Sequence, residues 1–386
     1  MDMLYAAFDP VPFPKGSAVR IEATVRALAA AGLKVDLLTV EPSHRPEGFA
    51  ERIECEGVEH RPVPIVGEHF LDRALAFREA TRTRLRERDY QVVMFRSPWE
   101  GLAAVEKGLP CVYEAHGFPS VELPYHYPGV LSRPQLLDRL AAQEVACLRR
   151  SQLFVTPSAT GRTYLISRGA PPRQIEVIPN SILPENFPEP PAPPPGPPWR
   201  LAYLGTLAPW QGLTTLLEAL ARLKGRLPVQ LVLAGTRKGR WIRQARATAQ
   251  RLRVRSMLDF AGPLSRSNVL ELLWSCHFCL APLPDDPRNS LQGCCPIKLL
   301  EYMACGRPLL STQLRPVREL VTHAETGWLV RPNSCQALAE GIQQLAADPS
   351  LALELAQKAR LEVLDRFPRQ RFIAQIAHLV SRLQTG

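Results

Sequence analysis

A proline-dense segment, "PNSILPENFPEPPAPPPGPPWR" at residues 179 to 200, divides this chain of 386 residues into two parts of similar length. Proline fixes φ and lacks a backbone N–H, so such a segment forms neither a helix nor a central strand. It predicts a stiff, extended connector over residues 181–199. Because 386 residues exceed what one ordinary hydrophobic core holds, two domains are expected.

The two parts share one pattern, a short apolar run followed by a loop and an amphipathic stretch. "MLYAAF", "VDLLTV", "VVMFR", "CVYEAHG" and "LFVTPS" are predicted strands of the first part, and "IEATVRALAAAGLK" is a predicted helix. The pattern restarts with "WRLAYLG", "GLTTLLEALARL" and "VQLVLAG". Alternating strands and helices are typical of parallel sheets. We therefore predict an α/β fold with doubly wound domains over residues 1–180 and 200–368.

The last helix-like segment, within residues 369–386, is expected to pack back on the first domain. Two such domains would face each other across a cleft, at the carboxyl ends of their strands, where ligands of parallel sheets usually bind.

Composition narrows the class of protein. Hydrophobic residues make up 46% of the chain, and no apolar run approaches the roughly 18 residues that span a bilayer. The N-terminus has an acid where a signal peptide needs positive charge, which predicts a cytoplasmic protein. The formal charge of +10 attracts phosphorylated ligands or an anionic membrane surface and does not choose between them.

The cysteines predict neither disulfides nor a metal site. They number nine, an odd count, without the dense spacing of a secreted disulfide scaffold. "CHFC" at 276–279 has the spacing of metal ligands, but no second CxxC completes a set of four. We interpret these cysteines as small buried hydrophobes on a strand.

Three loops that follow predicted strands could hold an anion. Lys15, Gly16 and Ser17 open the first helix, where backbone N–H groups and one cation would face the ligand, although a plain capped turn explains them equally well. Gly205 and Gly212 repeat this arrangement in the second part. A third loop, "VLAGTRKGR", brings Arg237 and Lys238 within reach of a diphosphate.

Two arginine-rich stretches predict exposed helices. The stretch from Arg237 to Arg255 carries only positive charge, which favours a solvated helix face over a nucleic-acid groove because stacking aromatics are nearly absent. "FLDRALAFREATRTRLRER" in the first part carries Phe70, Leu71, Leu75 and Phe77, which could instead rest on a lipid surface.

In "CCPIKLLEYMACGRPLLST", residues 294 to 312, Pro296 suits the start of a helix and Gly306 its end. Lys298 and Glu301 then share one helix face. Spacing alone supports two interpretations equally: a surface ion pair, or a helix N-terminus whose cation and carboxylate hold the phosphate and ribose of a nucleotide.

The ordered set of these stretches resembles glycosyltransferase family 4, with the GT-B fold. The resemblance is carried by "GSAVRIEATVRALAAAGLKVDLLT", "VIPNSI", "YLGTLAPWQGLTTLLEAL", "FAGPLSRSNVLELLWSC", "PIKLLEYMACGRPLLST" and "ETGWLVRPNSCQALAEGIQQLAADP". It implies retaining transfer of a sugar from a nucleotide-sugar to an acceptor, without an essential metal or other cofactor, with the donor held mainly by the C-terminal domain.

The resemblance also implies roles for single residues. Glu301 matches the carboxylate on the donor ribose, Gly16 with Ser17 the glycine loop near the donor phosphates, and His116 the cleft histidine after an N-domain strand. "FAGP" at 260–263 matches the loop beside the nucleobase, which adds Phe260 and Gly262. Asn180 matches the residue that ends the first domain, where a hinge role is expected.

Three positions depart from the family. The first Glu of its paired motif is Gly293 here, and the Arg and Lys that neutralise the diphosphate read Thr206 and Gln211. The compensating charge is expected from Lys298, Arg237 and Lys238.

We therefore predict His116 and Lys298 as catalytic residues. The predicted donor site is formed by Gly16, Ser17, Gly205, Thr206, Gln211, Arg237, Lys238, Phe260, Gly262 and Glu301. Rival hypotheses are a nucleotide-sugar epimerase of the same fold and a non-catalytic sugar-nucleotide-binding protein. The predicted partners are a UDP-, GDP- or ADP-linked sugar, a glycan, lipid-linked or small-molecule acceptor, and an anionic membrane at its inner face, but no nucleic acid.

Overall fold

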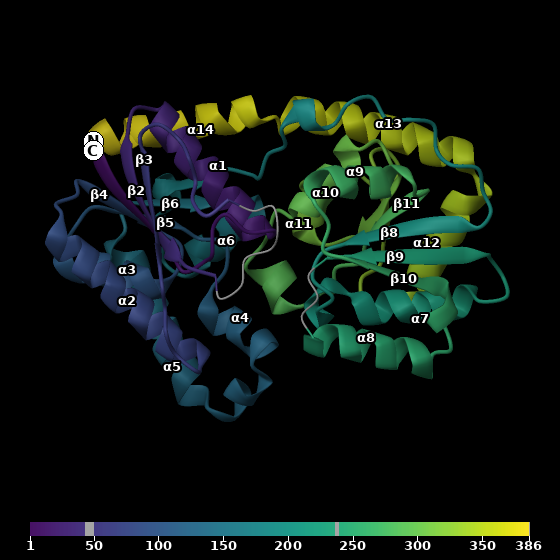
Figure 1. The fold of residues 1–386 in the computed structure, drawn as a ribbon, viewed down its shortest axis with the longest axis horizontal. Helices are drawn as coiled ribbons and strands as arrows, with labels where there is room; N and C mark the ends of the chain where they lie inside the picture. The colour runs from purple at the N-terminus through teal and green to yellow at the C-terminus, as the bar shows by residue number, and fades with distance from the viewer. Residues whose placement is uncertain (43–49, 236–238, 386) are drawn as a thin grey trace. The chain divides into compact units, whose positions relative to one another are not determined.

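The computed structural model describes residues 1–42, 50–235 and 239–385, and its chain divides into two compact units. Unit 1 comprises Met1–Asn180, Leu291–Cys294 and Gln370–Gly386, and unit 2 comprises Ser181–Ser290 and Cys295–Arg369. Each unit contains one parallel sheet with helices on both sides (Figure 1). The predicted α/β fold class, two doubly wound domains, is confirmed.

Unit 1 is built on a seven-stranded sheet of order β3-β2-β1-β4-β5-β6-β7. Its strands are β1 (Asp2–Ala7), β2 (Lys34–Val40), β3 (Val58–Val63), β4 (Val92–Phe95), β5 (Cys111–Glu114), β6 (Leu153–Thr156) and β7 (Ile175–Val177). Every pairing is parallel; for example, Tyr5 lies opposite Leu37 on one side and opposite Met94 on the other. The strand order reverses between β1 and β4, and loops that leave the sheet at such a switch point diverge to opposite faces.

The helices of unit 1 cover both faces of this sheet. They are α1 (Gly16–Ala30), α2 (Phe70–Glu87), α3 (Pro98–Lys107), α4 (Pro119–His126), α5 (Pro134–Arg150), α6 (Ala159–Ser167) and α14 (Arg369–Thr385). Met3 and Tyr5 pack with α1 and α14, whereas Leu4 and Ala6 pack with α2, α3, α5 and α6. This alternation along β1 follows from the two-residue period of a strand, and it explains why the run "MLYAAF" is apolar throughout.

Unit 2 has a six-stranded sheet of order β10-β9-β8-β11-β12-β13. Its strands are β8 (Trp199–Leu204), β9 (Val229–Ala234), β10 (Leu258–Gly262), β11 (Phe278–Ala281), β12 (Leu309–Thr312) and β13 (Trp328–Val330). Its helices are α7 (Leu213–Leu223), α8 (Gly239–Arg251), α9 (Arg266–Trp274), α10 (Ile297–Ala304), α11 (Arg315–Arg318), α12 (Cys335–Ala347) and α13 (Pro349–Arg366). The order reverses between β8 and β11.

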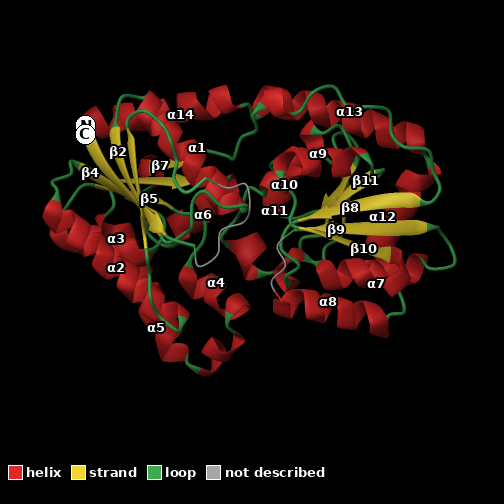
Figure 2. Ribbon diagram, in the orientation of Figure 1, coloured by secondary structure: helices red, strands yellow, loops and turns green. Residues whose placement is uncertain are grey.

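The helices of unit 2 also form two layers, as Figure 2 shows. One face of the sheet packs with α7, α8 and α12, and the other packs with α9, α10 and α11, while α13 contributes residues to both cores. Short 3-10 segments complete the chain: Pro128–Ser132, Pro172–Gln174, Pro184–Asn186, Pro209–Gln211 and Arg255–Met257. A π-helical turn spans Pro287–Leu291.

The proline-dense segment 181–199 lies against unit 2. Ile182 and Phe187 are buried in a core of this unit, and the buried guanidinium of Arg307 donates to the carbonyl of Pro191 at 3.1 Å and to that of Trp274 at 3.0 Å. The segment thus supplies one of the carbonyl groups that accept from this buried arginine.

The segment after Arg369 belongs to unit 1. In α14, Phe372, Ile376, Leu379 and Val380 join the same core as Met3 and Tyr5. In the described part of the chain, no helix combines the length and the apolar character that a membrane span requires.

Candidate functional site

In unit 2, one hydroxyl group fixes α10 at the point where the strand order reverses. The buried Tyr302 of α10 accepts a hydrogen bond from the backbone N–H of Leu204 at 2.7 Å and lies 3.4 Å from the carbonyl oxygen of Leu280. Leu204 ends β8 and Leu280 belongs to β11. The helix that follows "CCP" is therefore held against the carboxyl ends of the two strands that flank the switch point, where ligands of such sheets bind.

Lys298, one turn before Tyr302, extends over the loop that follows β8. Its ammonium donates to Gln211 Oε1 at 2.5 Å and lies 4.8 Å from the centroid of the Tyr203 ring. Burial raises the pKa of the Tyr203 phenol, so the ring stays neutral and interacts with the cation through its face. Tyr203 in turn donates to the carbonyl of Thr206 at 2.8 Å.

The backbone at the ends of β8 and β9 is exceptionally close-packed. A Cβ at Gly235 would lie 1.9 Å from the carbonyl oxygen of Gly205, and a Cβ at Gly205 would lie 3.2 Å from Lys298 Nζ. Both glycines have positive φ, and Gly212, with φ of +76°, would meet the Pro282 carbonyl at 1.6 Å. Only glycine fits these positions, so the backbone amides and the ammonium of Lys298 lie next to one another.

The first turn of α10 is open to an anion. Its N-cap residue, Pro296, provides no side-chain cap, and no acidic residue stands in the first turn. The half-buried Glu301 lies one turn later on the same helix. Uncapped N–H groups, a cation and a carboxylate can together contact phosphate and hydroxyl groups, as the nucleotide interpretation of this segment requires.

The remaining donor-site predictions for unit 2 fall into two groups. Arg237 and Lys238 lie outside the described residues. Gly262 ends β10 and accepts from the N–H of Gly235 at 2.8 Å, whereas the ring of Phe260 lies on the α7–α8 face of the sheet, with Arg246 and Arg255 each 5.2 Å from its centroid. A role for the Phe260 side chain in donor binding stays a prediction.

In unit 1, a buried carboxylate at the carboxyl ends of the strands binds several neighbouring side chains. Glu114 is the last residue of β5. Its carboxylate accepts hydrogen bonds from the Tyr5 hydroxyl, from Arg20 Nε at 2.9 Å and from the Thr24 hydroxyl at 3.4 Å. Arg96 Nε lies 3.4 Å from its other oxygen. Burial alone would raise the pKa of Glu114, but His116, Arg20 and Arg96 together hold it well below its ordinary value. The carboxylate is therefore ionised and pairs with two arginines in the interior.

His116 lies directly beside this network. Its Nε2 is 3.1 Å from Glu114 Oε1, and 18% of its side chain is exposed. Burial and the Arg96 guanidinium lower the pKa of His116 to about 4, although Glu114 acts in the opposite direction. The imidazole is neutral at physiological pH, so it can accept or donate one hydrogen bond without carrying charge.

Arg96 joins His116 to the glycine loop. It follows β4, next to β1 at the switch point, and donates to the carbonyl of Ser17 at 3.2 Å. Asp9, which follows β1, pairs with Lys15 and accepts from Ser17 Oγ at 3.2 Å. The predicted residues Gly16 and Ser17 thus begin α1 within a cluster of paired charges, and Lys15 gives the helix no side-chain cap.

Gly293, where the family has its first Glu, has no room for a side chain. Its φ is +75°, and a Cβ would lie 2.5 Å from the backbone nitrogen of Gly161 and 2.6 Å from Ser158 Oγ. The neighbouring Gln292 accepts from the N–H of Phe118 at 2.9 Å and donates to Glu122 at 2.8 Å. The loop before α10 is held by unit 1 through these contacts, so a carboxylate could not be placed at position 293 without moving backbone.

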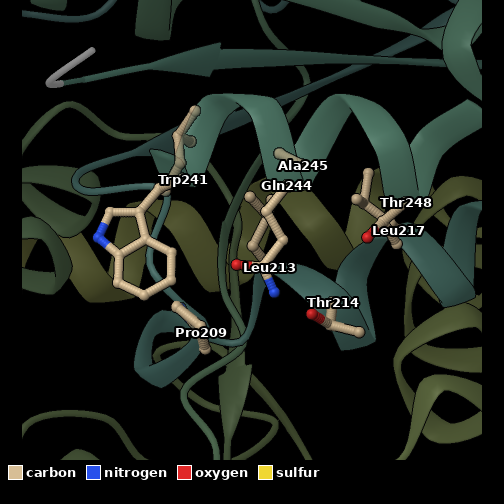
Figure 3. A pocket seen from close by; sticks show the side chains of 9 residues that line it. Pro209, Leu213, Thr214, Leu217, Trp241, Gln244, Ala245 and Thr248 are labelled. Atoms are coloured by element: carbon tan, nitrogen blue, oxygen red, sulfur yellow. The ribbon is translucent and has the colours of Figure 1, made fainter. Parts of the chain in front are cut away.

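A shallow pocket in unit 2 is not lined by Lys298 or Glu301. Its lining residues are Leu207, Pro209, Leu213, Thr214, Leu217, Trp241, Gln244, Ala245 and Thr248. Figure 3 shows the indole of Trp241 beside Pro209 at one end. It contains none of the predicted site residues.

Sequence reasoning missed Glu114, Arg96 and Arg20. The signal was available, because Glu114 ends a buried strand and Arg96 directly follows one, where a charged residue needs a partner. Among the described residues, no three His, Cys, Asp or Glu side chains gather as metal ligands would. The nine cysteines form no disulfide; Cys276 and Cys279 are both buried, Cys279 on β11 and Cys276 just before that strand.

Two family profiles match consecutive parts of the chain. The profile described as "Glycosyltransferase Family 4" matches residues 14–186, and that described as "Glycosyl transferases group 1" matches residues 188–362. A putative colanic acid biosynthesis glycosyltransferase, WcaL from Salmonella typhimurium, is 26% identical over 261 residues, which cover 67% of this chain and 63% of the relative. The chain thus spans less than two thirds of that relative's length.

Solved structures share the fold over the whole chain. Sucrose-phosphate synthase from Thermosynechococcus elongatus matches with a TM-score of 0.80 and 19% identity, covering 100% of this chain and 99% of that one. HepE from Anabaena, solved with UDP and glucose, matches with a TM-score of 0.74 and 18% identity, covering 99% of this chain and 100% of that one. At these identities the likeness establishes the GT-B architecture alone.

The contacts of Gly293 predict that adding one methyl group there lowers the unfolding free energy more than at an open glycine. Gly293→Ala should destabilise the protein by about 2 kcal/mol more than Gly108→Ala, as judged from urea unfolding. Gly108 is a matched control, since its φ is +76° but a Cβ there meets nothing within 4 Å. Equal losses in the two variants would show that φ alone, and not the contact with Gly161 and Ser158, excludes a side chain.

The lowered pKa of His116 predicts a pH dependence of stability. An unfolded histidine takes up a proton below a pKa of about 6.5, whereas folded His116 does so only near 4. Its neutral form therefore favours folding above pH 6.5, and this contribution is lost as the pH falls toward 4. Between pH 7 and 5, wild type should lose up to about 2 kcal/mol more unfolding free energy than His116→Gln.

The control for this measurement is His378→Gln, which removes an exposed histidine of α14. It should unfold with the same pH dependence as wild type. If His116→Gln also keeps that dependence, His116 does not stay neutral in the folded protein.

Proposed function

Because the chain belongs to glycosyltransferase family 4, we propose that it is a retaining, metal-independent hexosyltransferase that moves a sugar from a nucleotide-sugar to an acceptor. The acceptor would be a glycan, a lipid-linked glycan or a small molecule, and the reaction would take place in the cytoplasm, with peripheral contact to an anionic membrane. The names of WcaL and of HepE with UDP and glucose support this chemistry for relatives of the chain.

The observation that carries the proposal is the position of Lys298. Two family cations are replaced by Thr206 and Gln211, yet the ammonium of Lys298 reaches the Gln211 side chain at 2.5 Å. The positive charge missing from the loop after β8 is thus supplied from the first turn of α10. Gly205, whose missing side chain leaves space beside this ammonium, lets a diphosphate approach the backbone.

In the proposed reaction, the bond between the sugar and the diphosphate breaks as negative charge develops on the leaving group. Lys298 and the N-terminal amides of α10 would stabilise that charge, which lowers the barrier because these groups are already oriented. Glu301 would accept hydrogen bonds from the ribose hydroxyls. On the same face of the sugar, the departing phosphate would take the proton of the acceptor, so no paired carboxylates are needed.

His116 would orient the donor sugar or the acceptor by hydrogen bonding. Its neutral imidazole, next to Glu114, can donate from one nitrogen and accept at the other. Arg96 and the start of α1 with Gly16 and Ser17 would lie near the phosphates and acceptor, with Asp9 and Lys15 setting the local charge.

A donor screen by thermal shift tests the proposal and the role of Glu301. A UDP-, GDP- or ADP-sugar that binds the folded state should raise the melting temperature in a concentration-dependent manner. Glu301→Ala should weaken binding of that donor roughly 10- to 100-fold, since the hydrogen bonds of a carboxylate to two hydroxyls are lost. Glu271→Ala, which removes an exposed carboxylate of α9, should bind as wild type does.

Unchanged donor affinity in Glu301→Ala would contradict the ribose assignment. Formation of an epimer from the donor alone would identify the rival epimerase. Normal donor binding with neither transfer nor slow donor hydrolysis would favour a non-catalytic binding protein.

Lys298 is tested by comparing turnover with stability. Lys298→Ala should reduce the rate of transfer, or of slow donor hydrolysis, about 100-fold, because the leaving group loses its nearest cation. Its unfolding free energy should fall by no more than about 1 kcal/mol, as expected for a partly exposed side chain. Equal losses of turnover and stability, both expressed as free energies, would instead indicate a structural role.

A further inference from the structure

Helix α8 and the turn after it carry a dense positive charge that the proposed reaction does not use. Between Gly239 and Leu258 the chain has no acidic residue, and all its arginines are exposed. They are Arg240, Arg243, Arg246, Arg251, Arg253 and Arg255. We call Arg243, Arg246 and Arg251, which lie on the outward side of α8, the α8 arginine face.

Three arginines of α8 and its following turn contact aromatic rings, and one of them also contacts a carbonyl group. Arg240 lies 4.1 Å from the centroid of the Trp241 ring, and Arg246 and Arg255 flank Phe260. Arg255 also donates to the carbonyl of Leu258. Within the described residues, no carboxylate lies within 4.0 Å of the α8 arginine face, so its charge is not neutralised by the protein.

Helix α2, the other arginine-rich helix, differs from α8 because several of its arginines form ion pairs with glutamates. Arg82 pairs with Glu79 and Glu106, Arg86 pairs with Glu79, and Arg88 pairs with Glu59. Among the apolar side chains of α2, Phe77 is buried and Phe70 packs edge-on against Trp99, whereas Leu75 is 58% exposed. The sequence offered α2 as an alternative lipid-facing helix, but among the described residues the arginines without an acidic partner within 4.0 Å include Arg243, Arg246 and Arg251 of α8.

The chemistry of this surface favours a lipid bilayer over a nucleic acid. Single strands bind by stacking bases on open aromatic rings, but the rings of Trp241 and Phe260 are approached by the protein's own guanidinium groups. The outward residues of α8 are arginine, glutamine and alanine, which suit a diffuse negative surface.

We propose that the α8 arginine face docks unit 2 on an anionic lipid bilayer. This proposal names the surface that would make the membrane contact in the proposed function, and it rests on the proposed function only for that contact. It needs neither donor binding nor transfer. Anionic lipid would attract each arginine of the face, and the binding would weaken as salt screens the charges.

Vesicle sedimentation of the full chain tests this proposal. The protein should bind vesicles of equal parts phosphatidylcholine and phosphatidylglycerol, and it should not bind phosphatidylcholine alone. The triple variant R243Q/R246Q/R251Q should bind the anionic vesicles on the order of 100-fold more weakly, at roughly fivefold for each arginine. Raising the salt concentration should release the wild-type protein.

The matched control is R82Q/R86Q/R88Q, which changes the net charge by the same amount on α2. It should bind the vesicles within a fewfold of wild type. If both triple variants lose binding equally, net charge alone explains the attraction and the docking surface is wrong. Full vesicle binding by R243Q/R246Q/R251Q, or equal binding of wild type to neutral vesicles, would also overturn it.

Two further measurements separate this proposal from its rivals. A single-stranded RNA oligomer that binds more tightly than the vesicles, and that loses binding in R243Q/R246Q/R251Q, would assign the face to nucleic acid and overturn the lipid proposal. In the thermal-shift screen this variant should respond to the donor as wild type does. A chain that binds vesicles but no nucleotide-sugar would thus refute the proposed function and leave the docking surface standing.

Discussion

All pairings in both sheets are parallel, and this constraint determines where chemistry can occur in each unit. Parallel strands need crossover helices, so every strand of a sheet ends at the same edge, and loops diverge where the strand order reverses. In unit 2 that point is fixed by Tyr302, whose hydroxyl joins α10 to the ends of β8 and β11. In unit 1 it is fixed by Arg96, which joins the end of β4 to the start of α1. The candidate site residues depend on these two contacts for their positions.

The two edges use charge in different ways. In unit 1 the ionised Glu114 is enclosed by Arg20 and Arg96, and removal of one partner would leave a buried charge without compensation. Burial and the nearby Arg96 guanidinium lower the pKa of His116 and keep it neutral, against the effect of Glu114. In unit 2 the ammonium of Lys298 lies on the face of Tyr203 and donates to one amide oxygen, so this edge holds a positive charge beside the backbone of Gly205. One edge is therefore suited to hold a hydrogen-bonding group in place, and the other to receive an anion.

The sequence predicted the regular elements well and the site in part. "MLYAAF" and "VDLLTV" are strands because apolar residues cover both faces of a parallel sheet, and "PIKLLEYMA" is a helix because Leu299, Leu300 and Met303 share a buried side. The pairing of Lys298 with Gln211, 87 residues earlier, could not be read from spacing, because it depends on how α10 lies across β8. The proline-dense segment was predicted as a connector, and its contacts with Arg307 depend on a buried donor far along the chain.

The sequence by itself determined that this chain forms two α/β units, since the period of its apolar residues and its proline-dense segment are local properties. It also supplied the residue types of the candidate site and the family to which they belong. Only the tertiary structure decided that Gly293 excludes a side chain and that Glu114 pairs with arginines from two other elements. It also decided that arginines of α2 pair with acidic residues, whereas no carboxylate of the described residues pairs with Arg243, Arg246 or Arg251 of α8. The reason is physical: steric exclusion and charge pairing depend on distances between segments that are remote in sequence, and those distances exist only in the folded chain.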